Sequence, residues 1–199
     1  MRTLLLAALT VAALGGCAGV PTDTAGLAPR TDAQPSEQDR AWMRGIHEMN
    51  LADMQLGQLG VSKGSTPQIR TIGKAIVADH TKLDTKVTKA ATQLGIKLPA
   101  SPTADQRADI VRLQEATRKG FDQEFLAIMT NAHTQALATT QAEVAHGSSP
   151  AVVALAKVAV PSLQKHLSAL QQAQGASPAP QPSPGSETPQ SPMTPTGHE

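Results

Sequence analysis

Aromatic residues are nearly missing from this sequence of 199 residues, which contains one tryptophan, two phenylalanines and no tyrosine. A hydrophobic core must therefore consist mostly of leucine, isoleucine, valine, methionine and alanine. Such residues favour packing between helices, whereas the strands of a β-sandwich are enriched in β-branched and aromatic residues. The length accommodates one ordinary domain together with terminal segments.

An excess of charge of one sign is also lacking, because the formal net charge is only +1. The chain thus has no basic footprint of the kind that binds nucleic acid. It has no glycine-rich phosphate-binding loop, so a nucleotide is not expected as a partner either. Nucleophile elbows and CxxC motifs are missing as well, and the sequence favours a protein without catalytic residues. It does not indicate a protein partner.

The single cysteine, Cys17, excludes an intramolecular disulfide bond and directly follows an export signal. Arg2 supplies a positive charge, and residues 3–14 form an apolar segment that is too short to span a membrane as a mature helix. The stretch "LGGC" resembles a bacterial lipoprotein signal. We therefore expect a signal peptide over residues 1–16 and lipidation of Cys17 as a membrane anchor; the alternative is a plain secretory signal with an incidental cysteine. The residue after the cysteine is Ala18 and not an aspartate. By resemblance to Gram-negative lipoproteins, this favours sorting to the outer membrane, where the domain would face the periplasm.

Composition divides the rest of the chain into one domain between two polar segments. Residues 17–35 are predicted to be a flexible tether, and the proline- and serine-rich residues 176–199 a disordered tail. Within residues 36–175, apolar residues recur at helical spacing in five segments, without alternating strand patterns. Capping signals mark the helix starts: Ser36 with Asp39, Thr66 before Pro67, Thr103 with Gln106, and Ser149 before Pro150.

Short connections between long helices predict antiparallel neighbours. The expected fold is all-α, an up-down-up-down four-helix bundle with one short extra helix between the second and third long helices. We expect that short helix, near residues 104–117, to lie across the top of the bundle.

Each long helix carries one ionisable residue on its apolar stripe, and we call these four residues the polar layer: Asp53, His80, His133 and His166. With a rise of about 1.5 Å per residue, all four lie roughly 16 to 24 Å from the turn at residues 64–66. They are therefore expected to meet.

Two interpretations of the polar layer stay open. One is a buried hydrogen-bond cluster that fixes helix register without any cofactor. The other is a site for one Zn, Cu or Fe ion, since imidazole suits all three metals. A two-metal site of the ferritin type is not expected, because Glu-x-x-His is absent. The residues three positions before the histidines are Val77, Thr130 and Leu163.

Other residues are secondary candidates. Asp79 is expected at the edge of the bundle, and Asp122 near a helix start is expected to interact with the helix dipole. Pro161 should bend the last helix and aim His166 into the polar layer. The remaining histidines lie off the apolar stripes and are expected to be exposed: His47, His146 and His198.

Several stretches together resemble a bacterial family, the domain of unknown function 4142, over about residues 40–172. They are "MNLADMQLGQLG", "ADHTKL", "LGIKLP", "KGFDQEFLAIMTNAH" and "VPSLQKHL". The resemblance implies a ferritin-like helical bundle in an exported protein and implies no established activity. Asp53 stands where this family commonly has glutamate.

The leading hypothesis is an outer-membrane lipoprotein whose periplasmic bundle is a non-catalytic binding or envelope-stress module. The alternative is a metal-dependent redox or metal-storage protein that uses the polar layer as ligands.

Overall fold

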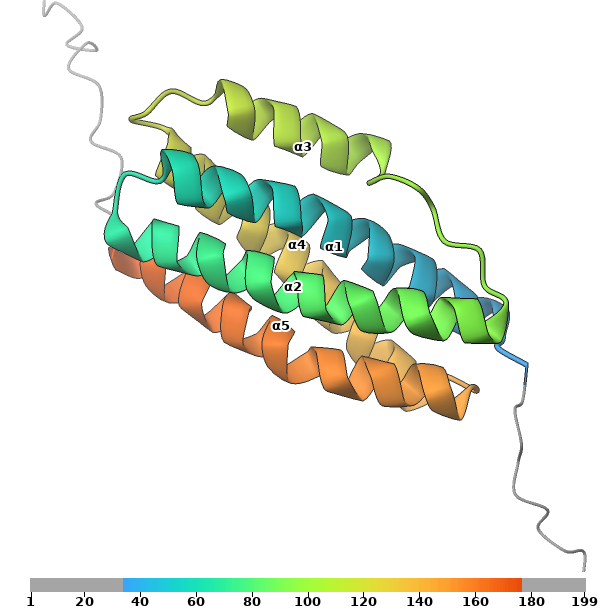
Figure 1. Ribbon diagram of the computed structural model, residues 1–199. Helices are drawn as coiled ribbons and strands as arrows, with labels where there is room; N and C mark the ends of the chain where they lie inside the picture. Colours follow the sequence, from blue (N-terminus) through green and yellow to red (C-terminus); the bar gives the residue numbers. More distant parts are fainter. Residues whose placement is uncertain (1–33, 177–199) are drawn as a thin grey trace, which may run out of the picture. The chain divides into compact units, whose positions relative to one another are not determined.

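The computed structural model describes residues 34–176, which form five α-helices and no strand (Figure 1). The helices are α1 (Glu37–Lys63), α2 (Pro67–Leu94), α3 (Ala104–Glu115), α4 (Phe121–His146) and α5 (Pro150–Ala176). The prediction of an all-helical domain with one short helix between long ones is confirmed. The predicted signal peptide, Cys17, the tether up to residue 33 and the tail from residue 177 lie outside the described residues. Within the described part, no helix is both long and apolar enough to cross a membrane.

Four of the five described helices, α1, α2, α3 and α5, begin at the predicted capping signals. At the start of α1, the Asp39 N–H donates to Ser36 Oγ at 3.2 Å and the Ser36 N–H donates to Asp39 Oδ2 at 2.6 Å. Thr103 and Gln106 form the same reciprocal box at the start of α3. Gly95 ends α2 in the left-handed conformation, with φ 64°, which glycine adopts without a steric penalty.

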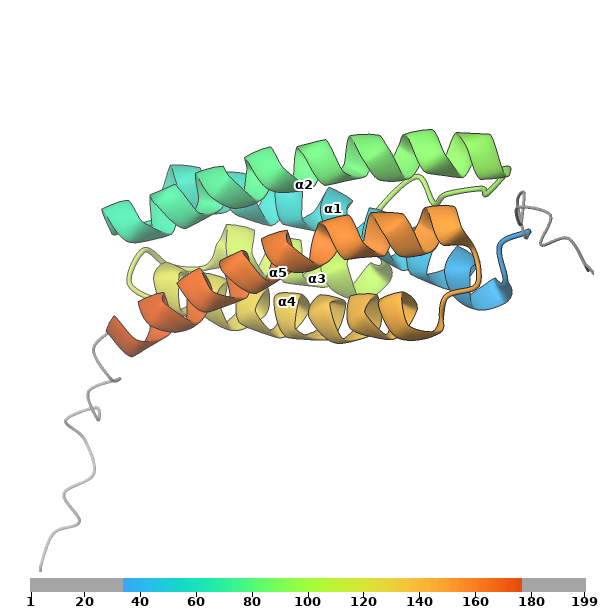
Figure 2. The ribbon, with the colours of Figure 1, turned by 90° about the horizontal axis from the view of Figure 1, so that it is seen from below.

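The four long helices pack side by side as a helical bundle. Both α1 and α5 contact α2 on one side and α4 on the other, and α3 packs outside against α1 and α4. Figures 1 and 2 show that α1 and α5 each run opposite to α2 and α4.

The predicted up-down-up-down order is wrong, because α2 and α4 run in the same direction (Figure 1). At one end, the Ser65 N–H in the α1–α2 turn donates to Asp122 Oδ1 at the start of α4, at 2.8 Å. At the other end, the Ser148 N–H between α4 and α5 donates to Asp39 Oδ1 at 3.0 Å. The connection from the end of α2 to the start of α4 therefore runs the full length of the bundle, from one end to the other.

The short helix α3 belongs to this returning connection and does not lie across the top. Its buried side chains, Ile110 and Leu113, belong to the same hydrophobic cluster as Phe121 and Phe125 of α4. The apolar stripe of α3 is thereby buried along the side of the bundle.

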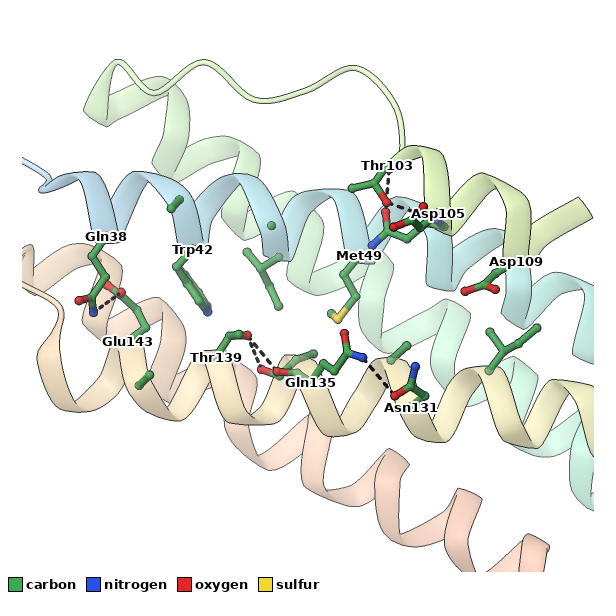
Figure 3. A pocket seen from close by; sticks show the side chains of 18 residues that line it. Gln38, Trp42, Met49, Thr103, Asp105, Asp109, Asn131, Gln135, Thr139 and Glu143 are labelled. Carbon is green, nitrogen blue, oxygen red and sulfur yellow. Dashed lines mark hydrogen bonds between the residues drawn. The ribbon is translucent and has the colours of Figure 1, made fainter.

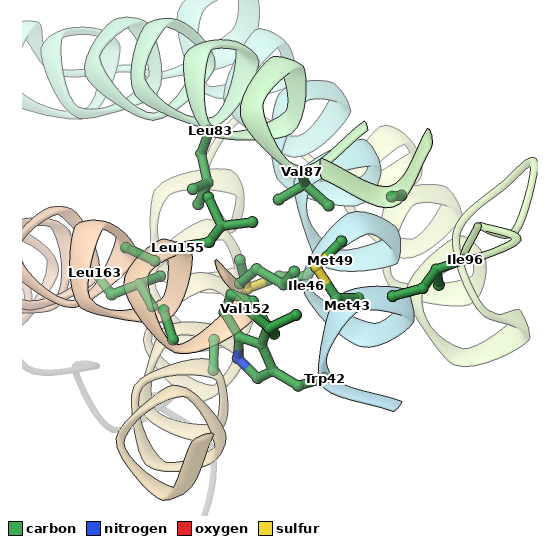
Figure 4. Close-up of a cluster of buried hydrophobic side chains, with 14 residues drawn as sticks. Trp42, Met43, Ile46, Met49, Leu83, Val87, Ile96, Val152, Leu155 and Leu163 are labelled. Carbon is green, nitrogen blue, oxygen red and sulfur yellow. The ribbon is translucent and has the colours of Figure 1, made fainter. Parts of the chain in front are cut away.

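Two hydrophobic clusters fill the bundle on either side of its middle. One surrounds Trp42, Met43 and Val87 and lies toward the start of α1 (Figure 4). The other surrounds Phe121 and Phe125, whose rings stack at 6.1 Å. Along α2, α4 and α5, the histidine of the polar layer lies between residues of the first cluster and residues of the second, and Asp53 of α1 follows Ala52, the first α1 residue of the second cluster.

A close approach of α1 to α2 and a proline inside α5 each depend on a single residue. A Cβ at Gly73 of α2 would lie 2.6 Å from the carbonyl oxygen of Gly57 in α1, so glycine is required where these helices approach closely. Pro161 lies inside α5 and cannot donate a hydrogen bond to Lys157. The helix continues through the proline and bends along its length (Figure 2).

Candidate metal centre

Four ionisable side chains, one from each long helix, meet in the middle of the bundle. They are Asp53 of α1, His80 of α2, His133 of α4 and His166 of α5, and none is more than 2% exposed. The structure therefore brings together all four residues of the polar layer, despite the wrong direction predicted for α4.

The three imidazole rings surround a common point. Their centroids lie 5.3 to 5.4 Å apart, and one ring nitrogen from each lies within 4.8 Å of the other two. Asp53 Oδ2 lies 3.5 Å from His80 Nε2 and 3.9 Å from His133 Nε2. Three ring nitrogens thus converge on one small volume, and the Asp53 side chain lies beside two of the three rings.

Asn50 fixes which nitrogen of His80 carries the hydrogen. The Asn50 Nδ2 donates to Asp84 Oδ1 at 3.3 Å, and this contact orients the amide so that its oxygen faces His80. That oxygen accepts from His80 Nδ1 at 2.8 Å. His80 Nε2 is then left with a free lone pair directed at the centre.

The other two histidines are oriented in the same way. His133 Nδ1 donates to the carbonyl oxygen of Met129 at 3.0 Å, so Nε2 keeps its lone pair. His166 Nε2 lies 3.1 Å from Asp79 Oδ2, a carboxylate that can only accept when ionised. His166 Nδ1 has no hydrogen-bond partner. In all three rings, an oxygen acceptor holds one N–H and the other nitrogen is free, which is the usual arrangement around metal-binding histidines.

Asp53 has no hydrogen-bond partner for either carboxylate oxygen. Buried polar groups are nearly always hydrogen-bonded, and an unpaired buried carboxylate is costly. In addition, His80 Nε2 and His133 Nε2 lie 3.3 Å apart with lone pairs facing each other. A cation between these atoms would satisfy all of them.

Burial also sets the protonation of the layer. It lowers the pKa of His80 well below its ordinary value, with further lowering by the two neighbouring histidines, and it lowers the pKa of His133 to about 4. Burial lowers the pKa of His166 as well, and raises the pKa of Asp53 to about 8. The imidazoles are therefore neutral at pH 7, as metal ligands must be, whereas Asp53 is mostly protonated at this pH and would release its proton on binding a metal ion.

The three secondary candidates differ in how close they lie to the candidate metal centre. Asp79, at the edge of the bundle, holds His166 and also lies 3.7 Å from Lys165. Asp122 lies at the end of the bundle, where it accepts hydrogen bonds from Ser65, and is not part of the centre. Pro161 precedes His166 by five residues in α5.

One expectation about the remaining histidines is wrong, because His47 is buried. Its Nδ1 lies 2.7 Å from Asp84 Oδ1 and its Nε2 lies 3.1 Å from the carbonyl oxygen of Pro99, in the connection after α2. That connection covers the ring. His146 is exposed, as expected, and His198 lies outside the described residues.

Sequence reasoning missed Asn50 and Asp84, which support His80. Asn50 is fully buried, three residues before Asp53 on the same face of α1. An amide at a core position next to a predicted ligand is a signal that could have identified it.

The ligand set is typical of one transition-metal ion rather than of a pair. Three imidazoles and one carboxylate suit Zn²⁺, Cu²⁺ or Fe²⁺. Zn–N bonds of about 2.0 to 2.1 Å in a tetrahedral site separate two ligand nitrogens by roughly 3.3 Å, close to the His80–His133 distance. A pair of metals needs bridging carboxylates, and Asp53 is the only carboxylate that the described residues place within 4 Å of these two histidines.

A model of one protein family matches residues 24–173; its description is "Domain of unknown function (DUF4142)". The chain belongs to this family. No match was found among curated proteins.

Two solved structures share the fold. A DUF305 fragment from Deinococcus radiodurans has 14% sequence identity and a TM-score of 0.63, with 71% of this chain and 98% of that chain covered. CopM in the Cu(I)-bound form has 15% identity and a TM-score of 0.60, with 69% and 96% covered. At these identities the likeness concerns the fold alone.

Proposed function

We propose that this DUF4142 protein holds a single divalent transition-metal ion in the middle of an exported, ferritin-like helical bundle. The ligands are His80 Nε2, His133 Nε2, His166 Nδ1 and the carboxylate of Asp53. The observation that carries the proposal is the convergence of three imidazoles, each with one free nitrogen, beside a buried Asp53 side chain that has no hydrogen-bond partner.

The chemistry of the ligands favours a divalent ion over Cu(I). Soft thioether and thiolate ligands select Cu(I), whereas imidazole with carboxylate suits Zn²⁺, Cu²⁺ or Fe²⁺. CopM is described as Cu(I)-bound, so the proposed role shares metal binding with this structural neighbour but differs in the ion.

The role of the ion is to be held rather than to catalyse turnover. Catalytic metal sites keep an open coordination position that substrate or water can reach. Here all four ligands are buried, and hydrophobic clusters lie on both sides of them. A non-catalytic binding or storage role follows.

The ferritin-like assignment and the location are part of the proposal. Bundles of the ferritin type contain one long crossover connection, and the returning segment from α2 to α4 is such a connection. The lipoprotein-like signal supports a protein anchored at Cys17 in the outer membrane, with the bundle in the periplasm.

Elemental analysis of protein purified without chelators, loaded with Zn²⁺ and freed of unbound ion, tests the proposal. We expect about one equivalent of metal in the unsubstituted protein and in the His146→Ala control, and less than about a tenth in His80→Ala. If the unsubstituted protein also retains less than about a tenth of an equivalent of Zn, Cu, Fe or Mn, the polar layer is a hydrogen-bond cluster that fixes register.

A further inference from the structure

A groove of about 750 Å³ runs between α1 and α4, on the side of the bundle that α3 covers only in part (Figure 3). Its volume lies within the range of about 300 to 1,000 Å³ that is typical of binding pockets. None of the four polar-layer residues lines it. The groove is therefore a feature separate from the candidate metal centre.

The groove has an apolar floor, and its other lining residues are polar or small. The floor includes Trp42, Ile46, Met49 and Ile128. A Cβ built at Gly45 would have no other atom within 4 Å, so space is left above this part of α1. Trp42 Nε1 donates to Thr140 Oγ1 at 3.1 Å, which fixes the indole in the floor. A ligand here would cover the 7% of Trp42 that remains exposed.

The groove is lined by acidic rather than basic side chains. Asp105, Asp109 and Glu143 line it, and no lysine, arginine or histidine does. Glu143 is buried at one end, whereas Asp105 is exposed on the first turn of α3. Asp109 lies 3.1 Å from Arg112, one turn further along α3. A ligand with an apolar face and positive charges complements this lining.

The shape of the groove fits a helix, and α3 shows how one would pack. The same trough between α1 and α4 holds α3 over its other half, where Ile110 and Leu113 are buried. The open half extends from Gln38 to Met49 on α1 and from Ile128 to Glu143 on α4. At about 1.5 Å per residue, these spans correspond to roughly 16 to 22 Å.

We propose that this groove binds a basic amphipathic helix of another protein, with about 11 to 15 residues in contact. Its apolar face packs on Trp42 and Ile46 beyond the start of α3, and its lysines or arginines face the carboxylate of Asp105. The proposal is independent of metal binding, because the groove and the polar layer share no residue.

Trp42 provides the readout, because it is the only tryptophan of the chain and lies in the groove. The probe is a synthetic tryptophan-free peptide of about 14 residues, with leucines on one helical face and lysines on the other. The control peptide has glutamate in place of each lysine. We expect saturable change in Trp42 fluorescence with the lysine peptide in metal-free protein, and binding at least about tenfold weaker with the glutamate peptide.

Substitutions in the groove test its position. Gly45→Leu fills the open space and should weaken peptide binding at least about tenfold, while Gly175→Leu, at another helical glycine with open space, should leave it unchanged. Asp105→Lys changes only an exposed side chain and should weaken binding several-fold, which keeps the test valid if Gly45→Leu does not fold.

Several results would overturn the proposal. They are no fluorescence change with the lysine peptide, equal binding of the two peptides, or binding that neither Gly45→Leu nor Asp105→Lys weakens. A change of Trp42 emission with protein concentration alone would assign the groove to a second copy of the chain, which also contradicts the proposal.

Discussion

The Nε2 atoms of His80 and His133 face each other at 3.3 Å in the core of the bundle, while the Nδ1 atom of each ring is hydrogen-bonded to an oxygen acceptor. Two neutral imidazoles in this orientation bring two lone pairs together. Such an arrangement is unfavourable alone and favourable around a cation. This pair of nitrogens is the strongest indication that the polar layer is a metal centre.

The residues that orient the histidines should affect metal affinity without being ligands. We predict that Asn50→Ala and Asp79→Ala each weaken metal binding by about 10- to 100-fold, because they release His80 and His166 from their fixed orientations. Competition with a chelator of known affinity measures the change. The control is Asn131→Ala, which alters an exposed side chain of α4 two residues from His133. Equal affinities for all three variants would contradict the assigned roles.

Protonation of Glu143 should make the stability of the bundle depend on pH. Burial, and then the adjacent Asp39 carboxylate, raise the pKa of Glu143 from 4.5 to about 7. Because the folded state binds this proton more tightly than the unfolded state, the stabilisation is complete below the unfolded pKa and is lost as pH rises through about 7.

Glu143→Gln keeps a neutral side chain at every pH and should reduce the loss of unfolding free energy between about pH 5 and 8. Urea denaturation of metal-free protein across this range measures the effect, with the exposed Glu115→Gln as the control. A decline in Glu143→Gln as steep as in the unsubstituted protein is the contrary result.

Two glycines in the helices should respond to alanine with opposite signs. A Cβ at Gly73 would meet the backbone of Gly57 at 2.6 Å, so Gly73→Ala should destabilise the protein by about 1 to 3 kcal/mol. Gly45 has open space, and Gly45→Ala should stabilise α1 by about 0.5 to 1 kcal/mol. The midpoints of urea denaturation measure both changes. Stabilisation by Gly73→Ala would be inconsistent with the close approach of α1 and α2.

The proposed anchor depends on Cys17. We expect Cys17→Ser to move the protein from the membrane fraction to the soluble fraction, because the thiol is the proposed site of lipidation. Fractionation of cells that express each form measures this. An unchanged distribution would refute lipidation and leave a plain secretory signal.

Local features of the fold could be predicted because their causes are local. The capping pairs at Ser36 and Thr103 involve residues only three positions apart. Such interactions are visible in the sequence.

The direction of α4 could not be predicted, because it depends on how the connection before it packs. His133 nevertheless reaches the polar layer, since it lies twelve residues after Phe121 and thirteen before His146. Reversing the helix therefore hardly changes the height of its middle residue.

The other differences between the predicted and the observed site, at His47 and Asn50, arise from contacts with residues far away in the sequence. The ring of His47 is covered by Pro99, 52 residues later, and Asn50 is oriented by Asp84, 34 residues later. Nothing in the spacing of α1 reveals that these side chains are enclosed by α2 and the segment after it.

The most direct test is an anomalous difference map from crystals of the protein soaked with Zn²⁺, recorded on both sides of the zinc absorption edge. We predict one strong peak inside the bundle, within about 2.0 to 2.2 Å of His80 Nε2, His133 Nε2, His166 Nδ1 and an Asp53 oxygen. A map with no peak among these four side chains, in protein whose helices are otherwise in place, would contradict the proposed metal centre.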